Sequence, residues 1–206
     1  TAFEPVAPPT QRAIFGYGTT GSDSSLTNLV NSSGVVAADV TGVGTARTWL
    51  GATNYGGDKV IFGYGSTGSN SSLTNLVSNT GVVASDVTGV GTARSAVGAA
   101  SYGGDKGIFG YGSTATNLTN IVSNLGVVAS DTTGVGTARA ELGATGYGTD
   151  KAIFGFGSNS VGYTSITNLV NNLGAVATDT TGVGTGRNGI AATEYGGDKA
   201  IFGYGS

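Results

Sequence analysis

The sequence of 206 residues contains no cysteine, no histidine and no methionine. Without cysteine it can form no disulfide, and without thiol or imidazole ligands the usual protein sites for zinc, copper, haem and iron–sulfur clusters are excluded. Acid–base catalysis by histidine and nucleophilic catalysis by cysteine are excluded for the same reason. The sequence therefore predicts no metal site and no catalytic chemistry of these kinds.

Charge and long apolar runs are also scarce. Only 10% of the residues are charged, the net charge is −3, and Lys and Arg form no cluster. A mildly acidic chain without a basic patch is a poor partner for nucleic acid. No apolar stretch approaches the ~18 residues that a membrane-spanning helix needs, and no signal-peptide pattern is visible. We therefore expect neither nucleic-acid binding nor membrane insertion.

Glycine is abundant, with 39 residues, and it belongs to an internal repeat of about 47 residues. Four periods start near residues 12, 59, 106 and 151, and closing strands follow in residues 188–206. Residues 1–11 carry all three prolines and read as a Pro-rich arm or linker. Three strings define the period: Ile-Phe-Gly-Tyr/Phe-Gly from Ile14, Ile61, Ile108, Ile153 and Ile201; Leu/Ile-Thr-Asn-Leu/Ile-Val from Leu26, Leu73, Leu118 and Ile166; and Thr-Gly-Val-Gly-Thr-Ala/Gly-Arg ending at Arg47, Arg94, Arg139 and Arg187.

Each period predicts four short β-strands and no helix. In the second period the strands are expected at Lys59–Tyr64, Leu73–Ser78, Gly81–Asp86 and Ala96–Tyr102. These stretches are rich in Val, Ile, Phe, Tyr and Thr and are bounded by Gly, Asn and Ser, as strands are. Four strands in every repeat of this length are typical of the blades of a β-propeller.

The residues from Gly91 to Gly112 resemble a kelch repeat, with an Arg, a strand of small residues, a Gly-Gly turn and an apolar strand that ends in glycines. The stretch from Leu73 to Gly81 resembles the third kelch strand and its turn. The resemblance implies an all-β, four-bladed propeller of four-stranded antiparallel blades, closed by strand exchange through Gly189–Tyr195. Similar arrays in phage and environmental proteins imply an extracellular or virion-surface location.

One strand is surplus to a four-bladed ring. The six residues Ala200–Gly205 repeat Ala13–Gly18, which makes 17 candidate strands for 16 positions. One copy must be displaced, pair with another molecule or belong to a longer array. Because an unpaired edge strand tends to recruit a partner, we expect a protein partner or self-association through this strand.

Charged residues recur with the repeat. An Asp precedes each Arg by eight residues, and an Asp-Lys pair follows each glycine turn. We interpret them as ion pairs between blades and as turn-capping carboxylates. Two alternatives are a ring of Arg47, Arg94, Arg139 and Arg187 that clamps an anion or an acidic peptide, and a ring of four Asp that binds calcium through six to eight oxygens.

Residues that break the repeat are the better candidates for a specific site. Trp49 is the only tryptophan and is in phase with Ala96, Glu141 and Gly189. Asp23 and Tyr163 lie in the loop whose length varies between repeats. Loops on a rigid scaffold are common binding sites, so these three residues could contact a sugar or a protein partner. Alternatively, Trp49 covers a blade edge or contacts the Pro-rich arm.

No catalytic or cofactor-binding set emerges. The stretch Gly16–Gly21 matches G-x-G-x-x-G, but a strand follows where a dinucleotide site needs a helix, so no cofactor is expected. The two acids outside the repeat pattern, Glu141 and Glu194, fall in different blades. We therefore expect a non-enzymatic structural or adhesion module. The alternatives are a lectin-like, carbohydrate-binding propeller with shallow sites in the variable loops and, less favoured, a glycosidase that uses two carboxylates.

Overall fold

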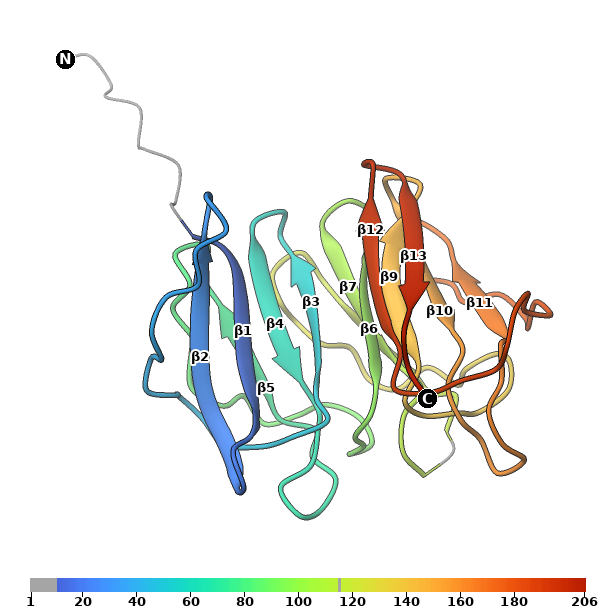
Figure 1. Cartoon of the computed structure of the whole chain (residues 1–206), viewed down its shortest axis with the longest axis horizontal. Coiled ribbons are helices and arrows are strands. Elements are labelled where there is room, and N and C mark those ends of the chain that lie inside the picture. The colour runs from blue at the N-terminus through green and yellow to red at the C-terminus, as the bar shows by residue number, and fades with distance from the viewer. Residues whose placement is uncertain (1–10, 115) are drawn as a thin grey trace.

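The structure is a computed structural model that describes residues 11–114 and 116–206 (Figure 1). Within these ranges the only regular elements are β-strands, which form five small antiparallel sheets. The described residues contain no helix that could cross a membrane. The prediction of an all-β protein of repeated antiparallel sheets is confirmed, whereas the Pro-rich arm lies outside the described residues except for Gln11.

We number the sheets 1 to 5 in chain order. Each of the three central sheets has three strands, and each of the two terminal sheets has two. Sheet 1 contains β1 (Gln11–Thr19) and β2 (Asp23–Asn31); sheet 2 contains β3 (Gly51–Tyr55), β4 (Lys59–Gly63) and β5 (Thr74–Val77); sheet 3 contains β6 (Gly98–Tyr102), β7 (Lys106–Gly110) and β8 (Thr119–Val122); sheet 4 contains β9 (Gly143–Tyr147), β10 (Lys151–Gly155) and β11 (Thr167–Val170); sheet 5 contains β12 (Ala191–Tyr195) and β13 (Lys199–Gly203).

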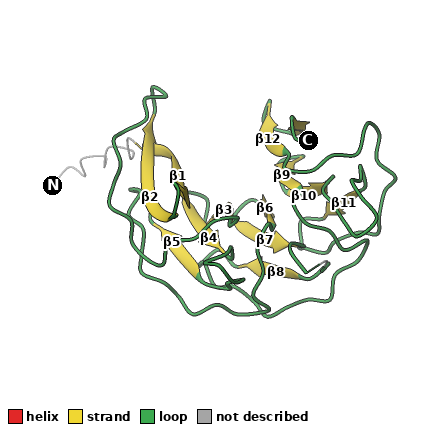
Figure 2. Cartoon of the chain, turned by 60° about the horizontal axis from the view of Figure 1, so that its bottom comes forward, coloured by secondary structure: helices red, strands yellow, loops and turns green. Residues whose placement is uncertain are grey.

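The five sheets follow one another along an open arc. Strands β3, β6, β9 and β12 contact each other in this order and form the inner side of the arc. Sheets 1 and 5 lie on either side of an opening (Figure 2). The arrangement places the first strand of every complete sheet toward the interior of the arc and its third strand toward the outside.

The apolar pair Ile-Phe holds neighbouring sheets together. Because successive side chains of a strand point to opposite faces, Phe62 packs toward sheet 1 and Ile61 packs toward sheet 3. Both side chains are buried. Gly63 completes the contact, since a Cβ atom there would lie 2.6 Å from Cζ of Phe109. The ring of the next sheet therefore requires glycine at this position.

The expected fourth strand is present only as isolated bridges. Residues 81–86 were predicted to be a strand, but they pair with β5 only through Val77 and Val83, followed by a bridge from Thr74 to Val87. The side chain of Asn75 donates to the carbonyl oxygen of Ala84 at 3.1 Å. A side-chain amide thus takes part in the pairing of β5 with this segment, which leaves the segment irregular.

The strand exchange expected at the C-terminus is not formed in this structure. Strand β12 pairs with β13, and β1 pairs with β2. Both copies of the Ala-Ile-Phe-Gly-Tyr-Gly sequence are therefore ordered, one in each terminal sheet. Among the described residues each terminal sheet has two strands, whereas each central sheet has three.

Candidate binding site on the inner side of the arc

The repeat arginines form internal clamps between neighbouring sheets. Arg47 lies between sheets 1 and 2, and its Nε donates to the carbonyl oxygen of Tyr64 at 2.8 Å. Its Nη2 donates to Oδ1 of Asn75 at 2.7 Å. Its Cζ lies 4.4 Å from the centre of the Tyr17 ring in sheet 1. Arg47 therefore binds sheet 2 through hydrogen bonds and sheet 1 through a cation–π contact.

A carboxylate completes the clamps of Arg47 and Arg94, and it comes from one period further along than the spacing of eight suggested. Nη1 of Arg47 lies 3.8 Å from Asp86, and the same atom of Arg94 lies 3.5 Å from Asp131. Burial alone would raise the pKa of the Asp86 carboxyl, but hydrogen bonds from Thr45 and Asn75 and the charge of Arg47 hold it below its ordinary value. Asp86 therefore stays ionised beside its arginine.

The fully buried arginines are not open to a ligand. Arg47, Arg94 and Arg139 have no exposed surface. Burial lowers the pKa of Arg139, whose Nη2 has no hydrogen-bond partner among the described residues. Arg187 differs, because it precedes β12 in the last described sheet and remains partly exposed. This placement gives no support to a ring of open arginines that would clamp an anion.

The aspartates of the glycine turns form local ion pairs. Each one accepts a hydrogen bond from the lysine that follows it, as Asp105 does from Lys106 at 2.9 Å. This hydrogen bond lowers the pKa of Asp105. Among the described residues no three acidic side chains gather where they could hold a metal ion. The turn aspartates are therefore spread along the arc and do not converge on an axis.

The three repeat-breaking residues are exposed, and they do not form one site. Asp23 begins β2 in sheet 1, and Tyr163 lies in the loop that precedes β11. Trp49 precedes β3, and its side chain is 62% exposed. Trp49 lines a cavity of about 160 Å³ together with Ala96 and Glu141, whereas neither Asp23 nor Tyr163 contributes to that cavity.

The position of Trp49 is conformationally special in every repeat. The φ angles are 56° at Trp49, 52° at Ala96, 56° at Glu141 and 58° at Gly189. Backbone hydrogen bonds connect the four positions in order, from the amide of Ala96 to Trp49 and onward along the arc. Left-handed backbone favours glycine, so the other three residues are held there at a cost. This line of residues forms the loop end of the inner side.

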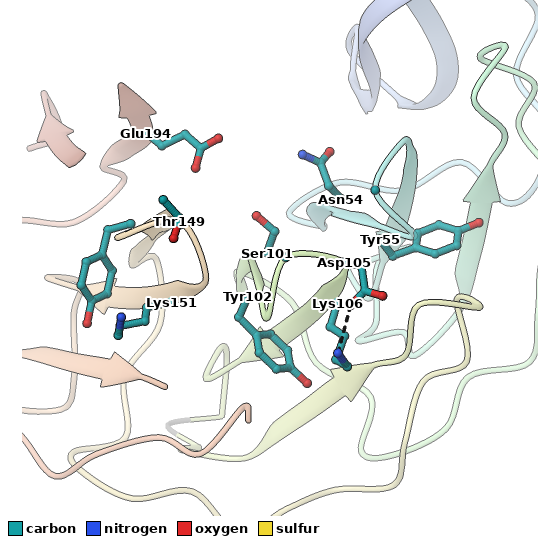
Figure 3. A pocket seen from close by; sticks show the side chains of 13 residues that line it. Asn54, Tyr55, Ser101, Tyr102, Asp105, Lys106, Thr149, Lys151 and Glu194 are labelled. Carbon is teal, nitrogen blue, oxygen red and sulfur yellow. Dashed lines mark hydrogen bonds and ion pairs between the residues drawn. The ribbon is translucent and has the colours of Figure 1, made fainter. Parts of the chain in front are cut away.

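A second cavity lies at the opposite end of the inner strands, beside the glycine turns (Figure 3). Its volume is about 160 Å³, and it adjoins a wider hollow of about 260 Å³ along β3, β6, β9 and β12. Both spaces share four lining residues, each of which is the fourth residue of its strand: Asn54, Ser101, Gly146 and Glu194. We call this set the inner quartet.

The inner quartet is polar and differs in every sheet. In Figure 3 the side chains of Asn54, Ser101 and Glu194 lie around the same space. Gly146 leaves room for its neighbour, because a Cβ atom there would lie 2.9 Å from Oε2 of Glu194. The quartet thus offers an amide, a hydroxyl and a carboxylate on a shared surface. Such a set can donate hydrogen bonds to a polar ligand and accept them from it.

Charged and aromatic side chains border this cavity. The Asp105–Lys106 pair and Lys151 stand at its rim, and the Tyr102 side chain is buried beneath it. Burial raises the pKa of Tyr102, so its hydroxyl stays protonated at neutral pH. The rim therefore presents charge of both signs around a polar surface that includes the Glu194 carboxylate.

The inner quartet is not among the site residues that the repeat pattern predicts. The signal was available, because superposing the four repeats shows one inner-strand position that changes from Asn to Ser to Gly to Glu. Glu194 had been considered only as a catalytic acid paired with Glu141. The structure places the two acids at different cavities, one at each end of the inner strands.

Two comparisons with known proteins found no match. No protein-family model matches the chain, and no curated protein matches it significantly.

Proposed function

We propose that this protein is a non-enzymatic structural or adhesion module, built as an array of kelch-like propeller blades, that binds its partner through the inner side of the arc. The repeat-wide charged residues support this reading, because they are used in the clamps and the turns. Only residues that differ between repeats can make one part of the surface different from another.

The observation that carries the proposal is the inner quartet. A position that only maintained the fold would be expected to stay similar in all four repeats, as Ala52 and its equivalents Ala99, Ala144 and Ala192 do. Two residues further along each strand, the chain instead carries four different residues around one cavity. An asymmetric polar surface on a symmetric scaffold suits the recognition of one particular partner.

A carbohydrate ligand is the second candidate. Sugars are recognised by planar polar side chains and by exposed aromatic rings, and the inner quartet supplies the former. Trp49 and Tyr163 supply exposed rings at the loop end of the molecule. A lectin-like function would therefore use either the turn-end cavity with Glu194 or the loop-end surface with Trp49.

A glycan-array screen of the full chain separates these functions. Under the carbohydrate hypothesis we expect binding that is lost in Glu194→Gln if the turn-end cavity is used, or in Trp49→Ala if the loop end is used. Glu141→Gln is the matched comparison for Glu194→Gln, because it makes the same chemical change at the opposite cavity. Absence of binding to every glycan favours a protein partner. Hydrolysis of an arrayed glycan would contradict the non-enzymatic proposal.

A further inference from the structure

The two terminal sheets are complementary parts of one repeat unit. A complete unit consists of a first, a middle and a third strand, followed by a bridging segment. Sheet 5 contains the first and middle strands. Sheet 1 contains the middle and third strands, and its bridging segment pairs with β2 through Val36 and Val40. Together the two sheets contain every part of a unit, with one middle strand to spare.

The arginine clamp is divided between the same two sheets. Arg187 makes the first contacts of a clamp: its Nε donates to Tyr204 at 2.7 Å, its Nη1 donates to Thr185 at 3.1 Å, and its Cζ lies 4.5 Å from the centre of the Phe156 ring. Among the described residues it has neither the asparagine nor the aspartate partner of Arg47. Among the described residues its Nη2 therefore lacks the side-chain acceptor that Asn75 provides to Arg47.

Sheet 1 holds an asparagine and an aspartate in the same arrangement as in the complete clamp of sheet 2. Asn28 donates to the carbonyl oxygen of Ala37 at 3.1 Å and to Oδ1 of Asp39 at 2.8 Å. In the complete unit Asn75 donates to Ala84 at 3.1 Å and to Asp86 at 2.9 Å. The acceptor half is thus preformed at the start of the array, and no described arginine occupies it.

The apolar surfaces of the two ends match as well. Phe15 is 62% exposed, whereas its equivalent Phe62 is 3% exposed, because no other described sheet packs against that face of β1. At the other end Phe202 packs against Phe156 with ring centres 5.4 Å apart. Since Ala13–Gly18 and Ala200–Gly205 are identical in sequence, Phe15 can take the place of Phe202 on that ring.

Of the two middle strands, β13 is the one held more weakly. Strand β1 is covered by sheet 2, whose Phe62 packs against Tyr17, and by the guanidinium of Arg47. Among the described strands β13 pairs only with β12, and Tyr204, directly after β13, is 91% exposed. Replacing β13 by β1 therefore costs less than replacing β1 by β13.

The partner that supplies β1 is best sought in another molecule, because the curvature of the arc is fixed by repeated contacts. The rings of Tyr17–Phe62, Tyr64–Phe109 and Tyr111–Phe154 have centres 5.2 Å apart in each pair and interplanar angles of 66°, 64° and 65°. With this curvature the two ends stay apart (Figure 2). A chain that closed on itself would have to change these contacts, whereas a second copy need not.

We propose that two copies of the chain associate head to tail: β1 and β2 of one copy join β12 of the other, β13 is released, and Arg187 closes on Asn28 and Asp39. The merged unit has the composition of sheet 2, including its clamp and its buried Phe. The contact is heterologous, so it leads to a ring if the geometry closes and to a filament if it does not. The proposal is independent of what the inner quartet binds.

Charge reversal tests this association without removing any strand. The variants are Arg187→Asp and Asp39→Arg, each in the full chain, with Lys59→Asp as the control for a charge reversal at an exposed site outside both ends. Sedimentation velocity over a range of concentrations gives the mass. We expect the wild type and the control to associate. Each single reversal should raise the dissociation constant by ~30-fold or more, because like charges then face each other at residues 39 and 187.

Mixing the two single variants distinguishes a second copy from closure within one chain. In the mixture each end meets an oppositely charged end of the other variant, so head-to-tail association returns. The double variant Arg187→Asp/Asp39→Arg also associates and shows that the reversed residues are compatible with folding. A wild type that is monomeric at every concentration would overturn the proposal. Single variants that associate as strongly as the wild type would also overturn it. The same holds for a mixture that stays monomeric while the double variant associates.

Discussion

The arginine clamps predict that burial, and not the length of an ion pair, decides how much a charged residue stabilises this fold. Arg94 and Lys106 provide the comparison. The Arg94–Asp131 distance is 3.5 Å, and the arginine is fully buried. The Lys106–Asp105 distance is only 2.9 Å, but 42% of the lysine side chain and 38% of the aspartate side chain are exposed. Replacement of each cation by methionine removes the charge and keeps an unbranched side chain.

The expected cost at Arg94 follows from the groups that would lose their partner. Its side chain donates to the carbonyl oxygens of Tyr111 and Thr92 at 2.9 and 3.1 Å, and its Cζ lies 4.4 Å from the centre of the Tyr64 ring. Removing one member of a buried ion pair costs ~3–5 kcal/mol. Asp131 is 25% exposed and keeps hydrogen bonds from Thr92 and Asn120, so here the cost falls mainly on the carbonyl oxygens that lose their donor. At ~2–4 °C per kcal/mol for a domain of this size, Tm falls by about 6–20 °C. Exposed pairs contribute little, so Lys106→Met lowers Tm much less.

Thermal unfolding followed by circular dichroism, together with urea titration, measures both variants under the same conditions. Folding is checked first from the far-ultraviolet spectrum at low temperature. The reasoning is refuted if Lys106→Met lowers Tm as much as Arg94→Met does, or if Arg94→Met causes no measurable fall. Either result would mean that the clamps are not the main electrostatic link between neighbouring sheets.

Three further predictions concern the backbone and the titration of the clamps. Gly63→Ala should destabilise the protein by ~1–3 kcal/mol, because the new methyl group overlaps a buried ring, whereas Gly203→Ala, whose Cβ would meet no atom within 4 Å, should be neutral in urea titrations. Ala96→Gly should stabilise it by ~0.5–1 kcal/mol in the same assay, because φ is 52° there. The pKa values of Asp86 and Asp131 are lowered in the folded state, so their contribution to stability is present above ~pH 4 and is lost as the pH falls through the folded-state values. Tm should therefore fall in acid, and it should fall less in the double variant Asp86→Asn/Asp131→Asn.

The repeat allowed much of the strand pattern to be predicted, because the middle strands of the three central sheets are largely buried and read as short apolar runs. The expected strand Lys59–Tyr64 is found as Lys59–Gly63, and the expected Ala96–Tyr102 is found as Gly98–Tyr102. The fourth strand could not be predicted correctly. Whether residues 81–86 form a regular ladder depends on the side chain of Asn75 from another strand, and this contact has no signature in the local sequence.

The candidate site was less predictable than the fold for a different reason. Trp49 is conspicuous as the only tryptophan, but each member of the inner quartet looks ordinary in its own repeat. Their importance depends on the fact that β3, β6, β9 and β12 lie side by side, which brings four differences to one cavity. The ion-pair partners depend on the fold in the same way: Arg47 lies beside Asp86 from the next period, whereas Asp39, nearer in sequence, accepts a hydrogen bond from Asn28 of sheet 1.

The clamps also explain why the two terminal sheets carry groups that can still bind a partner. Each clamp uses a ring from one sheet and acceptors from the next, so a repeat in isolation cannot complete one. Among the described residues, sheet 1 therefore keeps Asn28 and Asp39 without an arginine beside them, and Arg187, which precedes sheet 5, keeps neither an asparagine nor an aspartate partner. Stability in repeat proteins is carried largely by the interfaces between neighbours, so an array gains from any partner that completes the terminal interface. A second copy of the same chain carries both missing halves, and that makes it the partner whose chemistry fits both ends.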